Sequence, residues 1–309
     1  MTGQSGATKA SDPLMKPIGF IGLGRMGRPM VERIVKQGFS LCVFDHDPLS
    51  CASIKGVTVA QSPQEIGSIC NIVFSCVSTA DAYDAVALGP KGFASGGATQ
   101  IYVHLGTTGA AHVQKLAHAL NAFNIDTLDA PMSGGVVGAV DGALVSMVSG
   151  SPDTLAHVKK LIGSYSGRIM NFGPAIGVAQ IAKLINNGLL YANLLAALEG
   201  LVMGMKAGIA PPLLADLIAA SSGSSYANDI IIRRDVVTGS FAWGGTVEIL
   251  RKDLMAWQAL ADQLGVELPL NRAAADIFLK TIKPMTISED FTRVIDLVEK
   301  REGIIRNTP

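Results

Sequence analysis

The feature that most constrains the fold of this chain is a change of pattern near Pro174. From Pro17 to that point, short apolar runs that end at turn residues alternate with segments of helical periodicity. Alternation over this length predicts a doubly wound parallel sheet with helices on both faces. After Gly177 only helical patterns remain. We therefore predict an α/β domain over residues 16–174 and an all-α domain over residues 175–309.

The predicted strands of the first domain are short apolar runs beside glycine, proline or polar turn residues. They are 18–21, 40–44, 71–77, 101–105, 125–128 and 143–148. A helix is expected over 25–37, and Ser62-Pro63-Gln64-Glu65 is a capping box that begins another. The helices expected in the second domain are 178–207, 211–220, 225–237, 247–264 and 270–281.

The helix expected over 178–207 is apolar on nearly every face, with almost no charge between Lys183 and Glu199. Such a helix must be surrounded by other apolar groups. Because it also contains Asn186 and Asn187, we expect a buried core helix and not a membrane span. The other helices of the domain are too short to cover it, so a homodimer or homotetramer is expected.

The balanced composition limits the kinds of partner. The 309 residues include 25 Lys and Arg against 25 Asp and Glu, so no long-range field attracts nucleic acid or an anionic membrane. The four cysteines form no CxxC pair and no metal-ligand spacing, which favours a reducing, cytoplasmic location and predicts no metal site. Residues 1–15 are small and polar, and we expect a disordered extension and not a signal peptide.

The first chemical motif is Gly22-Leu23-Gly24-Arg25-Met26-Gly27, between a predicted strand and a predicted helix. Its glycines permit a tight turn and a close approach of the backbone to a pyrophosphate at the helix N-terminus. The alternative is an ordinary glycine-rich turn, but the strand and helix that the motif requires are both expected here. Asp45 ends the second strand, where a carboxylate binds ribose hydroxyls and repels a 2′-phosphate. We therefore predict a dinucleotide site that prefers NAD to NADP.

The second motif is Asp129-Ala130-Pro131-Met132-Ser133-Gly134-Gly135. It follows the fifth predicted strand, at the carboxyl edge of the sheet where ligands bind. Its Ser-Gly-Gly end offers backbone N–H groups and a hydroxyl, which suit a carboxylate. A flexible turn explains the same residues equally well.

The third motif contains Lys183 and Asn187, which share one helix face because they are four residues apart. Lys183 precedes the long apolar stretch, so burial is expected to lower its pKa into the range that an acid/base catalyst needs. A solvated lysine at a helix start is the alternative. Two successive asparagines inside a helix weaken that alternative, because they are poor helix formers and need partners when buried.

Together these motifs resemble those of the β-hydroxyacid dehydrogenases, the family of 3-hydroxyisobutyrate dehydrogenase, from Pro17 to about Lys280. The matching runs are 20–27, 129–135, 183–187 and Lys252-Asp253-Leu254. The resemblance implies a Rossmann-type domain followed by an all-α domain that mediates dimerisation. It also implies hydride transfer between NAD and a small 3-hydroxy acid that bears a carboxylate.

The resemblance further implies a role for individual residues. Lys183 would be the general acid/base and Asn187 would orient the substrate, while Ser133, Gly134 and Gly135 would hold its carboxylate. The implied cofactor contacts are Gly22, Gly24, Arg25, Met26, Gly27, Asp45, Val77, Ser78, Thr107 and Lys252.

Two segments depart from the family pattern. The family has an Asp-x-Ser-Thr run where this chain has His104-Leu105-Gly106-Thr107, so a serine hydroxyl that helps to position nicotinamide is missing. His104 is expected to be a strand-end residue, since Lys183 supplies the proton. Trp243-Gly244-Gly245 replaces a Pro-Gly-Phe run, and we expect it to shape the substrate pocket.

Three other functions fit the same scaffold. An imine reductase would generally lack a lysine at position 183. A decarboxylating dehydrogenase of the 6-phosphogluconate type would need a longer helical domain and more basic residues. A non-catalytic NAD-binding module would not need Lys183 and Asn187. The sequence leaves the substrate open among small hydroxy acids and the matching aldehydes.

Overall fold

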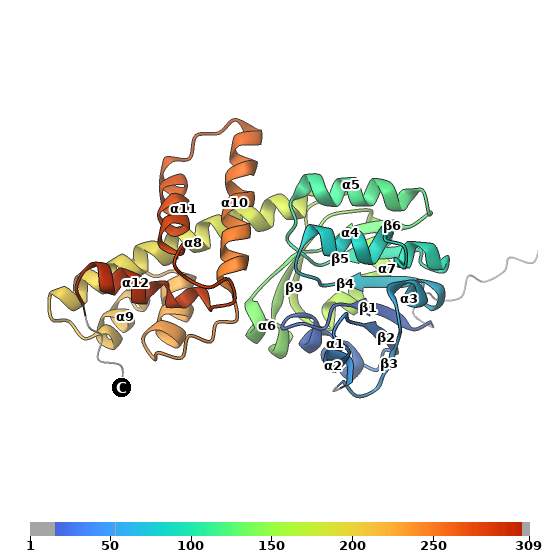
Figure 1. The fold of residues 1–309 in the computed structure, drawn as a ribbon, viewed down its shortest axis with the longest axis horizontal. Helices are drawn as coiled ribbons and strands as arrows, with labels where there is room; N and C mark the ends of the chain where they lie inside the picture. Colours follow the sequence, from blue (N-terminus) through green and yellow to red (C-terminus); the bar gives the residue numbers. More distant parts are fainter. Residues whose placement is uncertain (1–15, 53, 305–309) are drawn as a thin grey trace, which may run out of the picture. The chain divides into compact units, whose positions relative to one another are not determined.

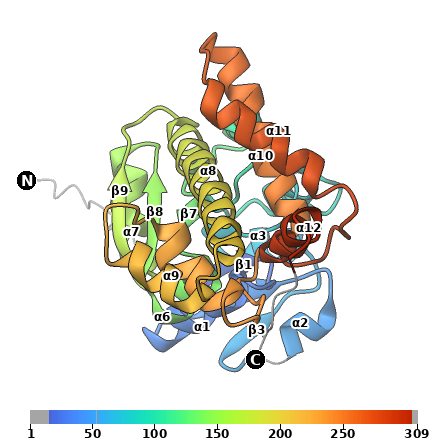
Figure 2. The ribbon, with the colours of Figure 1, turned by 90° about the vertical axis from the view of Figure 1, so that its left-hand side faces the viewer.

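The computed structural model describes residues 16–52 and 54–304, so the extension expected over residues 1–15 lies outside the described residues. The chain divides into two compact units between Ala179 and Gln180. Figures 1 and 2 show the sheet unit from blue to yellow-green and the helical unit from yellow to red. Each unit has its own hydrophobic core.

A six-stranded parallel sheet forms the centre of the first unit, as the alternating pattern predicts. Its order is β3-β2-β1-β4-β5-β6, so the chain winds one way from β1 to β3 and the other way from β4 to β6. Ligands bind at such a reversal, beyond the carboxyl ends of the strands. The strands are β1 (Ile18–Ile21), β2 (Leu41–Phe44), β3 (Val57–Val59), β4 (Ile72–Ser75), β5 (Ile101–His104) and β6 (Asp126–Asp129).

Alternate side chains along the strands enter two cores, one on each face of the sheet. Phe20 packs in the core that includes α1, α6 and α7, whereas Ile21 packs in the core that includes α3, α4 and α5. The N-cap bond of the predicted capping box is confirmed, because Ser62 Oγ accepts from Glu65 N at 3.2 Å where α3 begins. The Glu65 carboxylate accepts from the N–H of Gln61, one residue before Ser62, at 2.7 Å. The helices are α1 (Gly27–Lys36), α2 (Pro48–Ala52), α3 (Pro63–Ile69), α4 (Ala80–Leu88), η2 (Phe93–Gly96), α5 (Ala110–Asn121), α6 (Gly135–Asp141) and α7 (Pro152–Gly163).

The predicted strand over 143–148 exists but does not extend the parallel sheet, so that part of the prediction is wrong. It forms β8 (Leu144–Val148), which pairs antiparallel with β7 (Met132–Ser133) and parallel with β9 (Ser166–Asn171). After β6 the chain turns at Pro131 and continues into β7. β8 therefore pairs with β7, and an isolated antiparallel bridge joins Ser149, directly after β8, to Asp129 at the end of β6.

The regular elements described in the second unit are all helices, as predicted. Tyr191 and Leu198 of its longest helix pack in one core with Leu250 and Phe278. Its helices are α8 (Val178–Lys206), α9 (Pro211–Ala219), η3 (Ala227–Val236), α10 (Val247–Leu264), α11 (Pro269–Thr281), η4 (Phe291–Arg293) and α12 (Val294–Arg301). The helix expected over 225–237 is a π-helix, η3, rather than an ordinary α-helix.

The burial of α8 is less complete than its composition suggests. The helix is long and apolar enough to cross a membrane, but this is weak evidence because core helices of soluble proteins pass the same test. Only 44% of its most apolar window is buried. Ile185, Leu189 and Met203 are exposed at 49%, 53% and 73%. Their spacing places these apolar side chains along one side of the helix.

Candidate active site

The glycine-rich loop connects β1 to α1 with a geometry that needs glycine at two of its positions. Gly22 has φ +96°, and a Cβ there would lie 2.3 Å from the carbonyl oxygen of Cys76. A Cβ on Gly27 would lie 1.9 Å from the carbonyl oxygen of Gly22. Gly24, by contrast, is exposed and has open space where a Cβ would be. The loop therefore packs tightly against the sheet and leaves one glycine open, which fits the approach of a pyrophosphate.

Asp45, the residue directly after β2, bonds the backbone of this loop. Its Oδ2 accepts from the backbone N–H of Leu23 at 2.6 Å, and its Oδ1 accepts from the N–H of Asp47 at 2.9 Å. The exposed ring of His46 lies 3.0 Å from the same Oδ1. The carboxylate therefore has a structural role in addition to the ribose contact predicted for it.

The other predicted cofactor residues of the first unit lie at the carboxyl ends of β4 and β5. Val77 is beside the glycine-rich loop, since a Cβ on Gly22 would meet its Cγ1 at 3.1 Å. Ser78 is exposed, as are Gly24 and Arg25, whereas Met26 is half-buried. Thr107 lies in the loop between β5 and α5.

The structure explains why glycine replaces the expected serine at position 106. A Cβ on Gly106 would lie 2.3 Å from the hydroxyl oxygen of Tyr83 and 2.5 Å from two of its ring carbons. Tyr83 is fully buried, and its hydroxyl donates to the Ser75 carbonyl and accepts from Val77 N, both at 3.3 Å. The aromatic ring therefore occupies the space of the missing side chain. The sequence analysis did not identify Tyr83.

The predicted carboxylate anchor lies where β7 meets α6. Ser133 pairs with Val145 in the second sheet, and Gly134 and Gly135 follow with φ +126° and +64°. All three are half-buried. Positive φ at successive residues favours glycine and turns backbone N–H groups toward one side of the loop.

Lys183 and Asn187 lie on one face of α8 and are 9% and 5% exposed. Asn187 Nδ2 donates to Asp253 Oδ2 at 2.7 Å, and the hydroxyl of Tyr191 donates to the same oxygen at 3.3 Å. Asp253 Oδ1 pairs with Lys252 Nζ at 2.9 Å. Two neighbouring helices, α8 and α10, thus share one buried carboxylate.

The pKa of Lys183 is lowered from 10.5 to about 8. Burial is the largest cause, because it removes water from the ammonium form. The negative charge of Asp253 acts in the opposite direction, and the positive charge of Lys252 lowers the pKa further. An amine in this state exchanges protons near neutral pH, which suits a general acid/base.

Asp253 and Tyr191 are the residues of this network that the sequence analysis did not single out. Asp253 was part of a matching run, but only Lys252 had been given a role. A signal existed for Tyr191, which lies eight residues after Lys183 and so on the same helix face. Gly188 allows α10 to come close, since a Cβ there would lie 2.5 Å from the indole nitrogen of Trp257.

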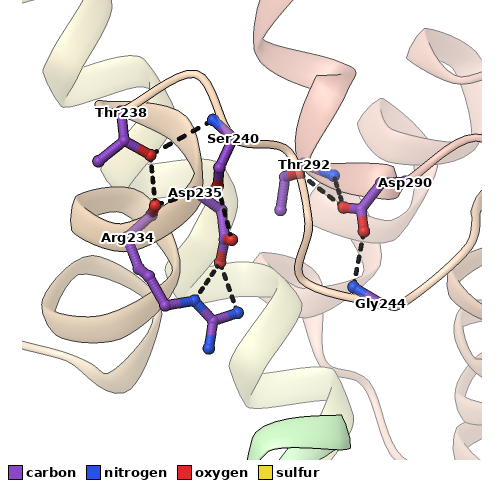
Figure 3. Close-up of polar contacts among 7 residues, drawn as sticks. All are labelled: Arg234, Asp235, Thr238, Ser240, Gly244, Asp290 and Thr292. Atoms are coloured by element: carbon purple, nitrogen blue, oxygen red, sulfur yellow. Dashed lines mark hydrogen bonds and ion pairs between the residues drawn. The ribbon is translucent and has the colours of Figure 1, made fainter. Parts of the chain in front are cut away.

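The Trp243-Gly244-Gly245 segment is held directly by Asp290 and indirectly by Asp235, which fixes Arg234 beside Trp243 (Figure 3). Asp235 pairs with the guanidinium of Arg234 at 2.7 Å and accepts from Ser240 Oγ at 3.0 Å. Asp290 accepts from the backbone N–H of Gly244 at 2.7 Å. The Arg234 guanidinium also lies 4.8 Å from the centre of the Trp243 ring. The segment that replaces the family's Pro-Gly-Phe run is therefore an ordered loop.

Two further features of the described residues concern sites other than the predicted one. No group of three His, Cys, Asp or Glu side chains is placed to hold a metal ion among them. A surface cavity of about 400 Å³ lies between α9 and η3, lined in part by Asp229 and Arg233. It contains none of the predicted site residues.

Comparison with known proteins identifies the family. The NAD binding domain of 6-phosphogluconate dehydrogenase matches residues 17–173, and the NAD-binding region of NADP-dependent 3-hydroxyisobutyrate dehydrogenase matches residues 177–298. The chain belongs to the β-hydroxyacid dehydrogenase family. The resemblance inferred from the motifs is confirmed, and the protein is an NAD(P)-dependent dehydrogenase that acts on CH–OH groups.

Members of this family match nearly the whole chain. The 2-(hydroxymethyl)glutarate dehydrogenase of Eubacterium barkeri is 30% identical over 93% of this chain and 96% of its own length. The mitochondrial 3-hydroxyisobutyrate dehydrogenase of Homo sapiens is 27% identical over 93% and 88%. A crystal structure of 3-hydroxyisobutyrate dehydrogenase from Salmonella typhimurium has a TM-score of 0.83, with 26% identity over 91% of this chain and 99% of that one. The protein is therefore a hydroxy acid oxidoreductase.

Proposed function

We propose that this dehydrogenase oxidises the hydroxyl of a small 3-hydroxy carboxylate, or reduces the matching semialdehyde, with Lys183 as general acid/base. The observation that carries the proposal is the buried amine of Lys183, whose pKa is lowered to about 8. Two relatives support the substrate class by their names. Both 2-(hydroxymethyl)glutarate and 3-hydroxyisobutyrate carry a hydroxymethyl group on the carbon next to a carboxylate.

The proposed role of Lys183 is to move one proton in each direction of the reaction. In oxidation, its neutral Nζ accepts the hydroxyl proton as a hydride leaves the carbon that bears this hydroxyl. In reduction, its ammonium form polarises the carbonyl oxygen and donates the proton to it. Bound nicotinamide supplies the hydride chemistry. A pKa near 8 keeps both forms of the amine populated close to neutral pH.

The proposed carboxylate anchor is Ser133 with the backbone N–H groups of Gly134 and Gly135. Two successive residues with positive φ favour an anion-binding turn, and the serine adds a hydroxyl donor. Fixing the acid end of the substrate places the reacting carbon before the chemical step, which removes an entropic cost from that step.

NAD is the proposed cofactor, because Asp45 places a carboxylate at the end of β2. A ribose 2′-phosphate at that position would meet the negative charge of Asp45, whereas a 2′-hydroxyl would find an acceptor. Lys252 is the proposed contact from the second unit, and its Nζ pairs with the Asp253 carboxylate at 2.9 Å.

A steady-state screen tests the function directly. Small 2- and 3-hydroxy carboxylates are offered with NAD and with NADP, and we expect turnover of a 3-hydroxy carboxylate with a higher kcat/KM for NAD. Lys183→Ala should lower turnover at least about a hundredfold and leave NAD binding nearly unchanged. Lys206→Ala, on an exposed position of the same helix, is the matched control. A Lys183→Ala enzyme that kept a tenth of wild-type activity would exclude the acid/base role.

The proposed assembly is a dimer or tetramer that covers the exposed side of α8. Ile185, Leu189 and Met203 leave an apolar stripe that a second copy could bury through two-fold symmetry. Light scattering at micromolar concentration tests this. A mass near the 32.2 kDa of one chain, in protein that turns over substrate, would exclude it.

A further inference from the structure

A chain of six hydrogen-bonded side chains runs beside the loop that carries Thr107, and the proposed mechanism does not use it. Its bonds join Ser75 Oγ to Tyr102 Oη (2.6 Å), Tyr102 Oη to His104 Nδ1 (3.1 Å), His104 Nε2 to Thr108 Oγ1 (3.0 Å), Thr108 Oγ1 to His112 Nδ1 (2.9 Å) and His112 Nε2 to Asp84 Oδ1 (3.1 Å). Ser75 and His104 are fully buried, whereas the Asp84 side chain is 47% exposed. The chain therefore leads from the surface into the core of the first unit.

The direction of the hydrogen bonds is set from the Asp84 end. An ionised carboxylate can only accept, so His112 donates to it from Nε2. A neutral imidazole that donates from Nε2 accepts at Nδ1, and Thr108 therefore donates its hydroxyl proton to His112. The oxygen of Thr108 then accepts from Nε2 of His104.

The same reasoning continues into the core. Neutral His104, donating from Nε2, must accept at Nδ1, so the phenol of Tyr102 donates to it. Burial raises the pKa of Tyr102, which keeps that proton on the phenol. The oxygen of Tyr102 accepts in turn from Ser75. With both imidazoles in the neutral form, every bond runs in one direction and both rings are Nε2–H tautomers.

We propose that Thr108, clamped between two imidazoles whose tautomers Asp84 selects, is a positioning residue for the cofactor. The proposal rests on the proposed function, because it needs NAD as the cofactor, and on the cofactor contact that the family resemblance implies for the neighbouring Thr107. The loop is held at two points, since Gly106 packs against the Tyr83 ring and Thr108 is fixed by His104 and His112. A loop that is ordered before NAD binds loses less conformational entropy on binding.

The tautomers can be measured without any cofactor. The chain contains only five histidines, so long-range ¹H–¹⁵N correlation spectra of histidine-labelled protein resolve each ring. Single His→Gln variants assign the signals. At pH 8 we expect His104 and His112 to be Nε2–H tautomers. A predominant Nδ1–H tautomer at either ring would overturn the proposal.

Thr108→Val tests the link to the cofactor, because it removes the hydroxyl and keeps the shape. We expect the Kd for NAD, measured by calorimetry, to rise about fivefold, the loss typical of one hydrogen bond. We also expect His104 to lose its single tautomer, because Thr108 joins it to His112, whereas His112 keeps its tautomer through its bond to Asp84. Thr108→Ser keeps the hydroxyl and should restore both properties. Thr58→Val, on exposed β3, is the matched control and should change neither.

Asp84→Ala tests whether Asp84 sets the direction of the hydrogen bonds in this chain of side chains. The Asp84 side chain is half-exposed, so its removal should leave folding unaffected. We expect a mixture of tautomers at His112 and a higher Kd for NAD. If His112 stays a pure Nε2–H tautomer and the Kd is unchanged, Asp84 does not select the tautomers and the proposal fails. If the wild-type protein binds NAD and Thr108→Val leaves the Kd for NAD unchanged, the positioning role alone is refuted. A wild-type protein that does not bind NAD would instead refute the proposed function.

Discussion

Lys183→Met should stabilise the protein at neutral pH while it abolishes turnover. The native environment lowers the pKa of Lys183 from 10.5 to about 8, mainly by burial. At about 1.36 kcal/mol for each pKa unit, the charged amine costs the folded state about 3 kcal/mol at pH 7. Methionine is of similar length and carries no charge, so it removes this cost.

The sign of the pH dependence follows from linkage. Because the folded-state pKa is the lower one, the full cost is present below about pH 8 and disappears as the pH rises past 10.5. The advantage of Lys183→Met over the wild type should therefore be about 3 kcal/mol at pH 7 and less than about 1 kcal/mol at pH 10.

Urea unfolding of both proteins at pH 7 and at pH 10 measures this difference. Lys206→Met, in the exposed last turn of α8, is the matched control and should give no pH-dependent difference from the wild type. If Lys183→Met were no more stable than the wild type at pH 7, or if its advantage did not shrink at pH 10, the burial argument would be refuted.

Two other predictions follow from contacts in the site. In the oxidation direction, log kcat/KM should rise with pH and level off near pH 8, because the neutral amine is the base. Asp253→Asn removes a charge that raises the pKa of Lys183, so the inflection should move to lower pH; an unmoved inflection would contradict the assigned coupling. Gly106→Ser should lower the free energy of unfolding by about 2 kcal/mol, because its Cβ would overlap the Tyr83 ring. In the Tyr83→Ala background, Gly106→Ser should lower the free energy of unfolding by much less. Strict additivity in that double-mutant cycle would show that the Tyr83 ring is not the obstacle.

The local patterns predicted the elements well because their signals lie within a few residues. The helix over Val247–Leu264 was predicted with both of its ends, and α8 was predicted to within one residue. The second sheet was missed because β7 has two residues and β9 carries polar side chains, so neither shows an apolar run.

The site was only partly predictable for a different reason. The pairing of Lys183 with Asn187 follows from helical spacing alone. Asp253 lies 66 residues from Asn187 along the chain, and only the packing of α8 against α10 shows that the two are bonded. The reason for Gly106 was equally hidden, because it depends on the buried position of Tyr83.

The close packing of Trp257 against Gly188 also makes the protein its own optical probe. The chain contains only two tryptophans, Trp243 and Trp257, and both belong to the helical unit. Trp257 is 5% exposed and packs against Gly188 of α8, so its emission should shift to the red as the helical unit unfolds. Fluorescence thus follows the unfolding of the helical unit alone, whereas circular dichroism follows both units. A difference between the two unfolding midpoints would measure how stable the sheet unit is once the helical unit has unfolded.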